Sequence, residues 1–449
     1  MSFILENQAL FSVAAGIILL LLLILKFKIH AFLSLLIASI TVGVLAGMAP
    51  AQIITTVQNG MGGTLGYVAT VVGLGAIFGA ILEHSGGALV IAENLLNRFG
   101  LNKAPLALTI TGFIIAIPVF FEVGFILMVP ILYALHRRTG KSLLYYAIPL
   151  LAGLAVTHAF IPPTPGPVAV ADIVGADLGN VILIGFMAGI PTTMVSGLLF
   201  GKYIGKKFFI TPPDAHADKN EQINKRVSFS MVLWLIGVPI LLILFNTVLN
   251  NSISGMQGTR IAELFELIGH PFTALIIANL LSLYFLGIKK GVSRKQLQEI
   301  SARSLAPAGV IILITGAGGV FKQVLIDTGA GNMMAASLSD IGFPLLLFGF
   351  VMAALVRIIQ GSATVAMITA AGLVAPLIPE QSPSAEMACI VIAIASGASI
   401  FSHLNDSGFW LVSQYLGMNE TQTFRSWTMM TTILAFTGLL SVMFISAMI

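Results

Sequence analysis

The feature that most constrains the fold of this chain is a series of long apolar runs that continues over its whole length. Each run has about 18–25 residues, which is enough for a helix to cross a hydrocarbon layer of about 30 Å. Only 9% of the 449 residues are charged and the mean hydropathy is +1.00, whereas soluble domains carry roughly 25% charged residues. The sequence therefore predicts an all-α polytopic membrane protein, with no room in these residues for a separate soluble catalytic domain.

The basic residues are distributed unevenly between the loops that join these runs. Alternate loops hold 19 of the 22 lysines and arginines, and the opposite loops hold only Arg260. The 19 residues are Lys26, Lys28, Arg98, Lys103, Arg137, Arg138, Lys141, Lys202, Lys206, Lys207, Lys219, Lys225, Arg226, Lys289, Lys290, Arg294, Lys295, Arg303 and Arg425. Because basic loops stay in the cytoplasm, a linker at 202–227 is expected inside the cell and both termini outside. The pI of about 9.1 then needs no nucleic-acid partner.

The chain repeats itself at an offset of about 240 residues. "KIHAFLSLLIA" (28–38) aligns with "IGHPFTALIIA" (268–278), and "GLGAIFGAILEHSGGA" (73–88) aligns with "GAGGVFKQVLIDTGAG" (316–331). We expect two halves, 1–201 and 228–449, each with about five transmembrane helices, a re-entrant hairpin and a broken helix. An odd number of crossings inverts the second half, and inverted repeats with discontinuous helices are typical of secondary transporters. Counting each hairpin as two spans gives about fourteen helices with the same sidedness, so the charge distribution leaves both topologies open.

Polar residues break the apolar pattern at matching places in the two halves. The first half contains "IPVFFEVGF" (117–125) and "THAFIPPTPGP" (157–167), and the second contains "RIIQGSATVAM" (357–367) and "FSHLNDSGFW" (401–410). A membrane helix can break only where protein or water satisfies the freed backbone groups. We therefore expect the broken ends to point their positive dipoles at a shared cavity that suits a small anion. The third span of each half is expected to begin near residues 64 and 305.

Arg357 is the first candidate for binding such an anion. Its planar guanidinium can hold a carboxylate with two parallel hydrogen bonds, and burying it without a partner costs about 2.5–3.5 kcal/mol even on mild insertion scales. Two alternatives to substrate binding remain for Arg357. It could form a permanent ion pair with Asp406 or Glu122, or its side chain could extend to the membrane interface. Gly361, Ser362 and Thr364 could bind a polyol through backbone and hydroxyl groups, although small residues at this spacing also serve helix packing.

Glu122 and Asp406 are the candidates for a carboxylate that carries a coupling proton, since acids inside the membrane are functional by default. His158 and His403 occupy near-equivalent places and could relay protons. The alternatives are carboxylates that pin an unwound segment and histidines that are satisfied structurally. Asn405 and Ser407 flank Asp406 and are further candidates for binding the substrate. As an alternative, these two side chains and Asp406 could coordinate Na⁺.

Taken together, "FFEVGF", "THAFIPPTPGPVAVA", "GSATVAM" and "SHLNDSGFWLV", in this order over the whole chain, resemble the gluconate permease family of bacterial proton symporters. The resemblance implies an inner-membrane symporter for gluconate or a similar sugar acid, and kinship with the ion-transporter superfamily. In that superfamily an elevator-like domain moves past a dimeric scaffold, which implies a homodimer here. The moving core would comprise 104–176 and 343–420, and Arg357 points to the sugar-acid branch.

Many relatives resemble "PPHPGP" at the proline-rich break, whereas Thr164 stands in place of the histidine. A threonine cannot relay protons, although it could bind a substrate hydroxyl.

The sequence thus favours import of gluconate or a closely related sugar acid by proton symport. The alternative is a permease for another small carboxylate or for D-serine on the same scaffold. Transport by such a permease could be coupled to sodium instead of protons. A channel is disfavoured. An intramembrane hydrolase that uses Ser402, His403 and Asp406 is also disfavoured, because the adjacent side chains of Ser402 and His403 point in different directions. We expect no enzyme activity, no cofactor, no metal and no nucleic-acid partner.

Overall fold

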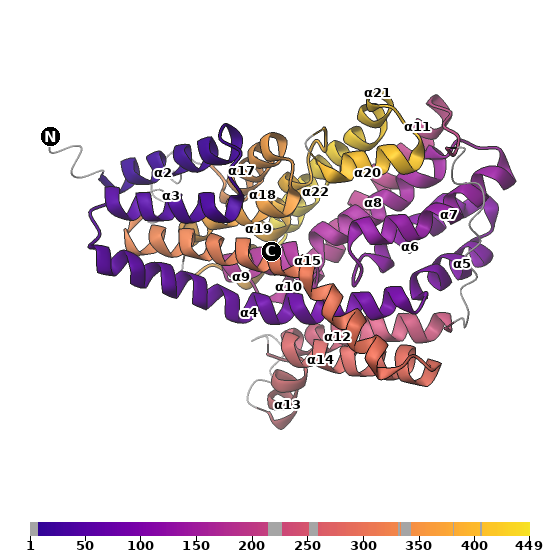
Figure 1. Cartoon of the computed structure of the whole chain (residues 1–449), viewed down its shortest axis with the longest axis horizontal. Helices are drawn as coiled ribbons and strands as arrows, with labels where there is room; N and C mark the ends of the chain where they lie inside the picture. Colours follow the sequence, from indigo (N-terminus) through magenta and orange to yellow (C-terminus); the bar gives the residue numbers. More distant parts are fainter. Residues whose placement is uncertain are drawn as a thin grey trace.

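The computed structural model describes residues 8–213, 227–250, 259–330, 333, 343–379, 381–404 and 406–449, and this part of the chain is all helical (Figure 1). Seven of the described helical segments are long and apolar enough to cross a membrane, and six shorter helices are also apolar. The expected all-α membrane fold is confirmed at this level. Most of the expected linker at 202–227 lies outside the described residues.

The first half contains α2 (Gln8–Leu25), α3 (Ala31–Leu45), α4 (Pro50–His84), α5 (Gly87–Phe99), α6 (Ala104–Ile115), α7 (Phe121–Thr139), α8 (Leu144–Phe160), α9 (Pro165–Val174), α10 (Leu178–Thr193) and α11 (Phe200–Lys207). The second half contains α12 (Phe229–Asn250), α13 (Arg260–Ile268), α14 (Pro271–Ser282), α15 (Arg294–Asp327), α17 (Leu345–Gln360), α18 (Ala363–Val374), α19 (Ser384–Ala398), α20 (Ser407–Leu416), α21 (Glu420–Thr423) and α22 (Met429–Ser446). A short π-helix, η8 (Phe424–Thr428), joins α21 to α22.

Local details recur at corresponding places in the two halves. His30 is the N-cap of α3, and its ring nitrogen accepts a hydrogen bond from the Phe32 amide at 3.4 Å. His270 caps α14 in the same way, with the Phe272 amide at 3.3 Å. In both cases a side-chain acceptor satisfies an amide that the first turn of a helix leaves unpaired. The aligned stretches of the sequence therefore begin equivalent helices.

Helices α4 and α15 are the longest of the described helices, and they pack against each other (Figure 1). A Cβ added to Gly60 would lie 2.7 Å from the Val320 Cα, so glycine allows the backbones to approach closely. Thr56 and Asp327 are joined across the same contact by a 2.5 Å hydrogen bond. Both helices begin earlier than expected, at Pro50 and Arg294 instead of near 64 and 305, because the polar turns that precede each apolar run continue the same helix.

Each half of the chain contains a pair of helices with an interruption between them and a further helix that is broken. The pair α6–α7 is interrupted at 116–120, and α17–α18 is interrupted at Gly361 and Ser362. Gly361 has φ +88°, a left-handed conformation that glycine adopts without strain. The α8–α9 helix is broken at 161–164 and the α19–α20 helix at 399–406.

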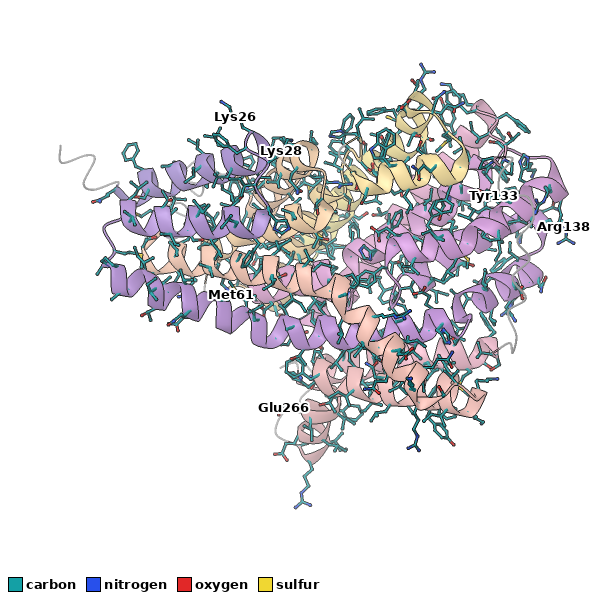
Figure 2. The ribbon with its side chains drawn as sticks, in the orientation of Figure 1. Lys26, Lys28, Met61, Tyr133, Arg138 and Glu266 are labelled. Carbon is teal, nitrogen blue, oxygen red and sulfur yellow. The ribbon has the colours of Figure 1, made fainter. Side chains whose placement is uncertain are left out.

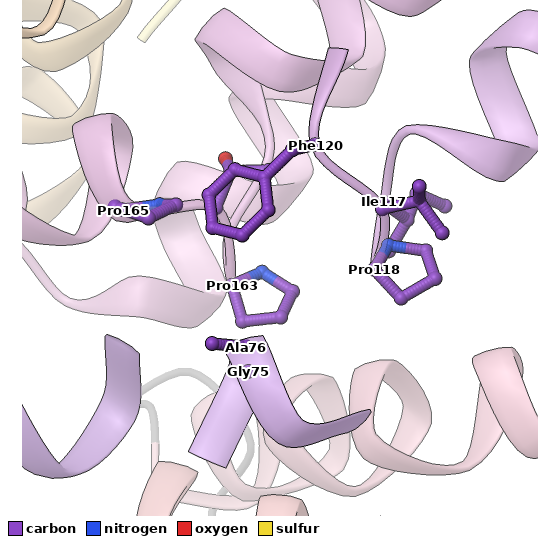
Figure 3. Close-up of a pocket in the computed structure, with 9 residues that line it drawn as sticks. Gly75, Ala76, Ile117, Pro118, Phe120, Pro163 and Pro165 are labelled. Carbon is purple, nitrogen blue, oxygen red and sulfur yellow. The ribbon is translucent and has the colours of Figure 1, made fainter. Parts of the chain in front are cut away.

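The two breaks of the first half lie directly on α4. An added Cβ at Gly79 would overlap the carbonyl oxygen of Pro118, and one at Gly75 would lie 3.2 Å from the carbonyl oxygen of Pro163. Figure 3 shows Pro118 and Pro163 on either side of a small space above Gly75. The helix α4 thus supports both breaks through its glycine-lined face.

Charged side chains lie mainly at the periphery of the bundle. Figure 2 shows Lys26 and Lys28 at the turn between α2 and α3, Arg138 at the end of α7, and Glu266 on α13, all pointing away from the helices. Inside the bundle, the Tyr133 hydroxyl of α7 donates a hydrogen bond to the Tyr415 carbonyl of α20. This bond ties the hairpin of the first half to the broken helix of the second.

Candidate binding cavity

A cavity of about 350 Å³ lies where the interrupted pairs and broken helices of the two halves meet. Its wall is formed by α7, α8 and α9 from the first half and by α17, α18, α20 and α22 with the intervening breaks from the second. The volume lies within the range of small-molecule sites, which is about 300–1,000 Å³. Polar and apolar groups share the lining, so the cavity suits a hydrophilic ligand.

Four helices begin at this cavity. Residues of the first turn of α7 (Phe121, Glu122), α9 (Gly166), α18 (Ala363) and α20 (Ser407) all line it. The first amides of a helix have no partner within the helix, and the macrodipole places a partial positive charge there. The convergence of these helix N-termini places several partial positive charges around the cavity.

Arg357 adds a full positive charge to the same cavity. It lies in the last turn of α17 and only 5% of its surface is exposed. One terminal nitrogen donates to the Asp406 carboxylate at 2.5 Å, and the other donates to the Gly361 carbonyl. Its Nε is buried without a partner among the described residues. A guanidinium has more N–H groups than these two contacts use, so it can hold its protein partners and still donate to a ligand.

Side-chain caps complete the wall of the second half. Asp406 caps α20 by accepting from the Gly408 amide at 3.1 Å, and its other oxygen accepts from the Ser402 hydroxyl as well as from Arg357. Ser362 caps α18 by accepting from the Val365 amide at 3.3 Å. Two helix N-termini are therefore partly satisfied by protein side chains.

Two titratable side chains from α7 and α8 also line the cavity, and neither makes such a bond to any residue that the structure describes. Glu122 is exposed to the cavity at the start of α7, and it interacts electrostatically with His158 of α8. The Nδ1 of His158 is buried and has no hydrogen-bond partner within the described part of the chain. The His158 ring lies 6.0 Å from the Phe120 ring, centroid to centroid. A carboxyl group and an imidazole thus line the same cavity as Arg357 and Asp406.

The cavity brings together most of the residues expected from the sequence. These are Glu122, His158, Arg357, Gly361, Ser362, Thr364, Asp406 and Ser407. Thr164 instead lines the small space beside α4, and its hydroxyl donates to the Ile161 carbonyl at 2.7 Å. The His403 ring nitrogen lies 2.6 Å from the Ile358 carbonyl and does not line the cavity. Asn405 lies outside the described residues.

Four further polar residues of the lining were not expected: Gln360, Ser399, Trp427 and Thr431. Gln360 lies inside the stretch 357–367, and Ser399 lies just before the stretch 401–410, each beside residues with stronger signals. Trp427 and Thr431 lie in an apolar span that shows no interruption, so the sequence carries no sign that they face a cavity. Ser402, which bonds Asp406, figured only in the disfavoured hydrolase hypothesis.

Comparison with known proteins decides the family. The model of the GntP family permeases matches residues 8–449. The chain belongs to this family. It is 42% identical to the low-affinity gluconate transporter of Escherichia coli (strain K12), over 94% of this chain and 95% of that protein. It is 36% identical to a gluconate permease of Bacillus subtilis (strain 168), and 37% identical to the Gnt-II system L-idonate transporter of Escherichia coli, each over 97% of this chain and 99% of the relative. This GntP permease is a multi-pass membrane transport protein and not an enzyme.

The fold is similar to that of solved transporters with little sequence identity. The YdaH transporter of Alcanivorax borkumensis matches with a TM-score of 0.63 at 12% identity, over 89% of this chain and 88% of that one. MtrF of Neisseria gonorrhoeae matches with a TM-score of 0.61 at 14% identity, over 87% of this chain and 83% of the other. At these identities the likeness concerns the fold alone. No group of three or more His, Cys, Asp or Glu side chains within the described ranges could hold a metal ion.

Proposed function

We propose that this GntP permease imports gluconate, or a closely related sugar acid, by proton symport across the bacterial inner membrane. The observation that carries the proposal is the single cavity in which four helix N-termini and Arg357 converge. Such a site favours a small anion. The names of the gluconate and L-idonate transporters among its relatives support a sugar acid as that anion.

In this proposal Arg357 binds the carboxylate of the substrate. The guanidinium keeps Asp406 and Gly361 and donates its remaining N–H groups, including the unpartnered Nε, to the ligand. The hydroxyl groups of the sugar acid are then within reach of Thr364, Ser407 and the backbone around Ser362. Thr164 and Asn405 stay secondary candidates, since Thr164 lies beside the cavity and Asn405 outside the described residues.

The coupling proton is assigned to the titratable groups of the cavity, with either Glu122 or Asp406 as its carrier and His158 as a relay partner. His403 is a weaker candidate because its ring is bonded to a carbonyl away from the cavity. Gluconate carries one negative charge, so symport with one proton moves no net charge. Each unit of pH gradient is then worth about 1.4 kcal/mol, or tenfold accumulation.

We further propose an elevator-type cycle on a homodimeric scaffold. The core would comprise 104–176 and 343–420, and the two halves would be inverted repeats with both termini in the periplasm. The equivalent His30 and His270 caps support the repeat. The uneven distribution of lysines and arginines supports the sidedness.

The test is uptake of labelled gluconate into proteoliposomes that contain the purified protein, with acid outside and no sodium. Accumulation that a protonophore abolishes is the expected result. The same liposomes are then tested with L-idonate, D-serine and added sodium. Uptake of D-serine but not gluconate, or uptake that requires sodium, would overturn the assignment of substrate or of coupling ion respectively.

Arg357→Lys tests the binding mode. Lysine keeps the positive charge but loses the planar fork, so the half-saturating gluconate concentration is expected to rise by about tenfold or more. Uptake at a series of gluconate concentrations measures it. An unchanged half-saturating concentration in folded protein excludes bidentate binding by Arg357.

A further inference from the structure

Ser402 lies in the break between α19 and α20, and all of its polar groups are bonded. Only 1% of its surface is exposed. Its amide donates to the Thr431 hydroxyl at 3.1 Å, and its carbonyl accepts from the Thr428 hydroxyl. Both partners come from η8 and α22, C-terminal to the proposed moving core, so these hydrogen bonds require this part of η8 and α22 to move with the core. The break is therefore fixed at Ser402 to the last long helix of the chain.

The side chain of Ser402 connects Trp427 to Asp406. The Trp427 indole nitrogen lies 2.6 Å from the Ser402 hydroxyl oxygen, which lies in turn against an Asp406 carboxylate oxygen. An indole N–H can only donate. The hydroxyl must accept from Trp427, so its own proton points to Asp406. The Trp427 side chain is 3% exposed and packs on Phe121 with ring centroids 5.4 Å apart, which holds the indole in this orientation.

The neighbours of the Asp406 carboxylate are all donors. One oxygen accepts from Arg357 and Ser402, and the other accepts from the Gly408 amide. An ionised carboxylate is an acceptor only, whereas a protonated one must donate. A proton on either oxygen would face a donor, so this arrangement fits the ionised form. The other titratable and charged side chains that line the cavity are Arg357, Glu122 and His158.

Glu122 is in the opposite situation. Within the described residues its carboxylate makes no hydrogen bond, and it is exposed to the cavity beside His158. It can accept or release a proton without breaking a contact. The two carboxylates of the cavity therefore differ in what they can do, although each is an acid at the start of a helix.

We propose that Ser402 and Trp427 are positioning residues that hold Asp406 as the ionised counter-ion of Arg357 and so leave the coupling proton to Glu122. The inference rests on the proposed function, because it divides the roles of binding and coupling between two sides of the same cavity. Ser402 and Trp427 act through Asp406 on Arg357, which presents its free N–H groups to the substrate carboxylate.

The first test compares gluconate exchange in proteoliposomes without a pH gradient. Ser402→Ala and Trp427→Phe each remove one link, and the half-saturating gluconate concentration is expected to rise about tenfold, as for a lost hydrogen bond to a charged group. Ser402→Thr keeps the hydroxyl and is expected to restore the wild-type value. Ser396→Ala and Trp410→Phe are the matched controls, because Ser396 bonds the Ile392 carbonyl and Trp410 the Leu404 carbonyl. An unchanged value in both Ser402→Ala and Trp427→Phe overturns the positioning role.

The second test separates exchange from accumulation. Glu122→Gln is expected to retain exchange and to lose accumulation driven by the pH gradient, because exchange needs no net proton movement. Ser402→Ala is expected to keep the wild-type ratio of protons to gluconate despite its weaker binding. If Ser402→Ala loses proton coupling while Glu122→Gln keeps it, Asp406 carries the proton and the inference is wrong.

Failure of the proposed function is recognised separately, since wild-type protein would then neither exchange nor accumulate gluconate. The positioning role is decided in that case by melting temperatures in detergent. Ser402→Ala and Asp406→Asn are expected to be non-additive, because both remove the same contact. Additive shifts would show that Ser402 does not act through Asp406.

Discussion

The helix breaks of the first half contain prolines, whereas those of the second half are built from charged and hydroxyl-bearing residues. In the first half, neither Phe120 nor Thr164 makes a side-chain cap bond at the start of α7 or α9. In the second half, Ser362 and Asp406 cap α18 and α20. The same interruption of a helix is therefore built in two chemically different ways.

This difference explains why the two walls of the cavity have different properties. Proline breaks a helix without any polar side chain, so the first half can leave Glu122 and His158 free of structural bonds. In the second half the polar side chains that break the helices are also bonded to one another. Side chains that are hydrogen-bonded to one another suit a fixed binding site. Titratable side chains without such hydrogen bonds in the described structure suit proton transfer.

The largest expected effect compares the two carboxylates by removing the charge of each. Asp406→Asn leaves the buried Arg357 without its ion-pair partner, which is expected to cost about 3–5 kcal/mol of stability. Glu122→Gln removes a side chain without bonds and is expected to change stability by less than about 0.5 kcal/mol. Thermal unfolding of the purified variants in detergent measures both. Equal losses would show that the two walls do not differ in this respect.

A smaller effect is expected where the first half depends on backbone contact. Gly79→Ala places a methyl group against the Pro118 carbonyl, and overpacking of this kind costs about 1–3 kcal/mol. Gly62→Ala on the same helix is the control, because nothing lies within 4 Å of an added Cβ there. Yield and melting temperature report the difference. If Gly79→Ala has the same melting temperature as Gly62→Ala, α4 does not support the proline-rich breaks.

The smallest effect concerns a single cap of the second half. Ser362→Ala removes the acceptor for the Val365 amide at the start of α18, which is expected to cost about 1 kcal/mol. Ser362→Asn keeps a capping acceptor and should recover most of the loss. A melting temperature that is the same for the serine and alanine proteins would mean that the cap contributes nothing to the hairpin.

The sequence predicted the helical membrane fold and most of the cavity because both depend on strong local signals. Proline, glycine and charged residues within apolar runs indicate breaks, and breaks at matching places indicate a shared cavity. The roles of Arg357 and Asp406 could be named as alternatives, but the sequence could not show that the two side chains are bonded to each other.

The remaining features depend on tertiary contacts that leave no local signal. Trp427 of η8 and Thr431 of α22 face the cavity from one apolar span whose sequence shows no break, and only the orientation of that span brings them there. Thr164 is displaced into a smaller space because its hydroxyl bonds the Ile161 carbonyl. The early starts of α4 and α15 arise because the polar turns before each apolar run continue the same helix.

The contact of Gly60 with Gly319 and Val320 also bears on how such a chain can evolve. A backbone-to-backbone contact between α4 and α15 means that neither half can enlarge its side chain there without a change in the other. On the proposed inverted repeat, α4 and α15 would thus lose the freedom to diverge independently at this crossing. Substitutions at these positions are expected to depend on genetic background, with a change tolerated in one lineage and harmful in another.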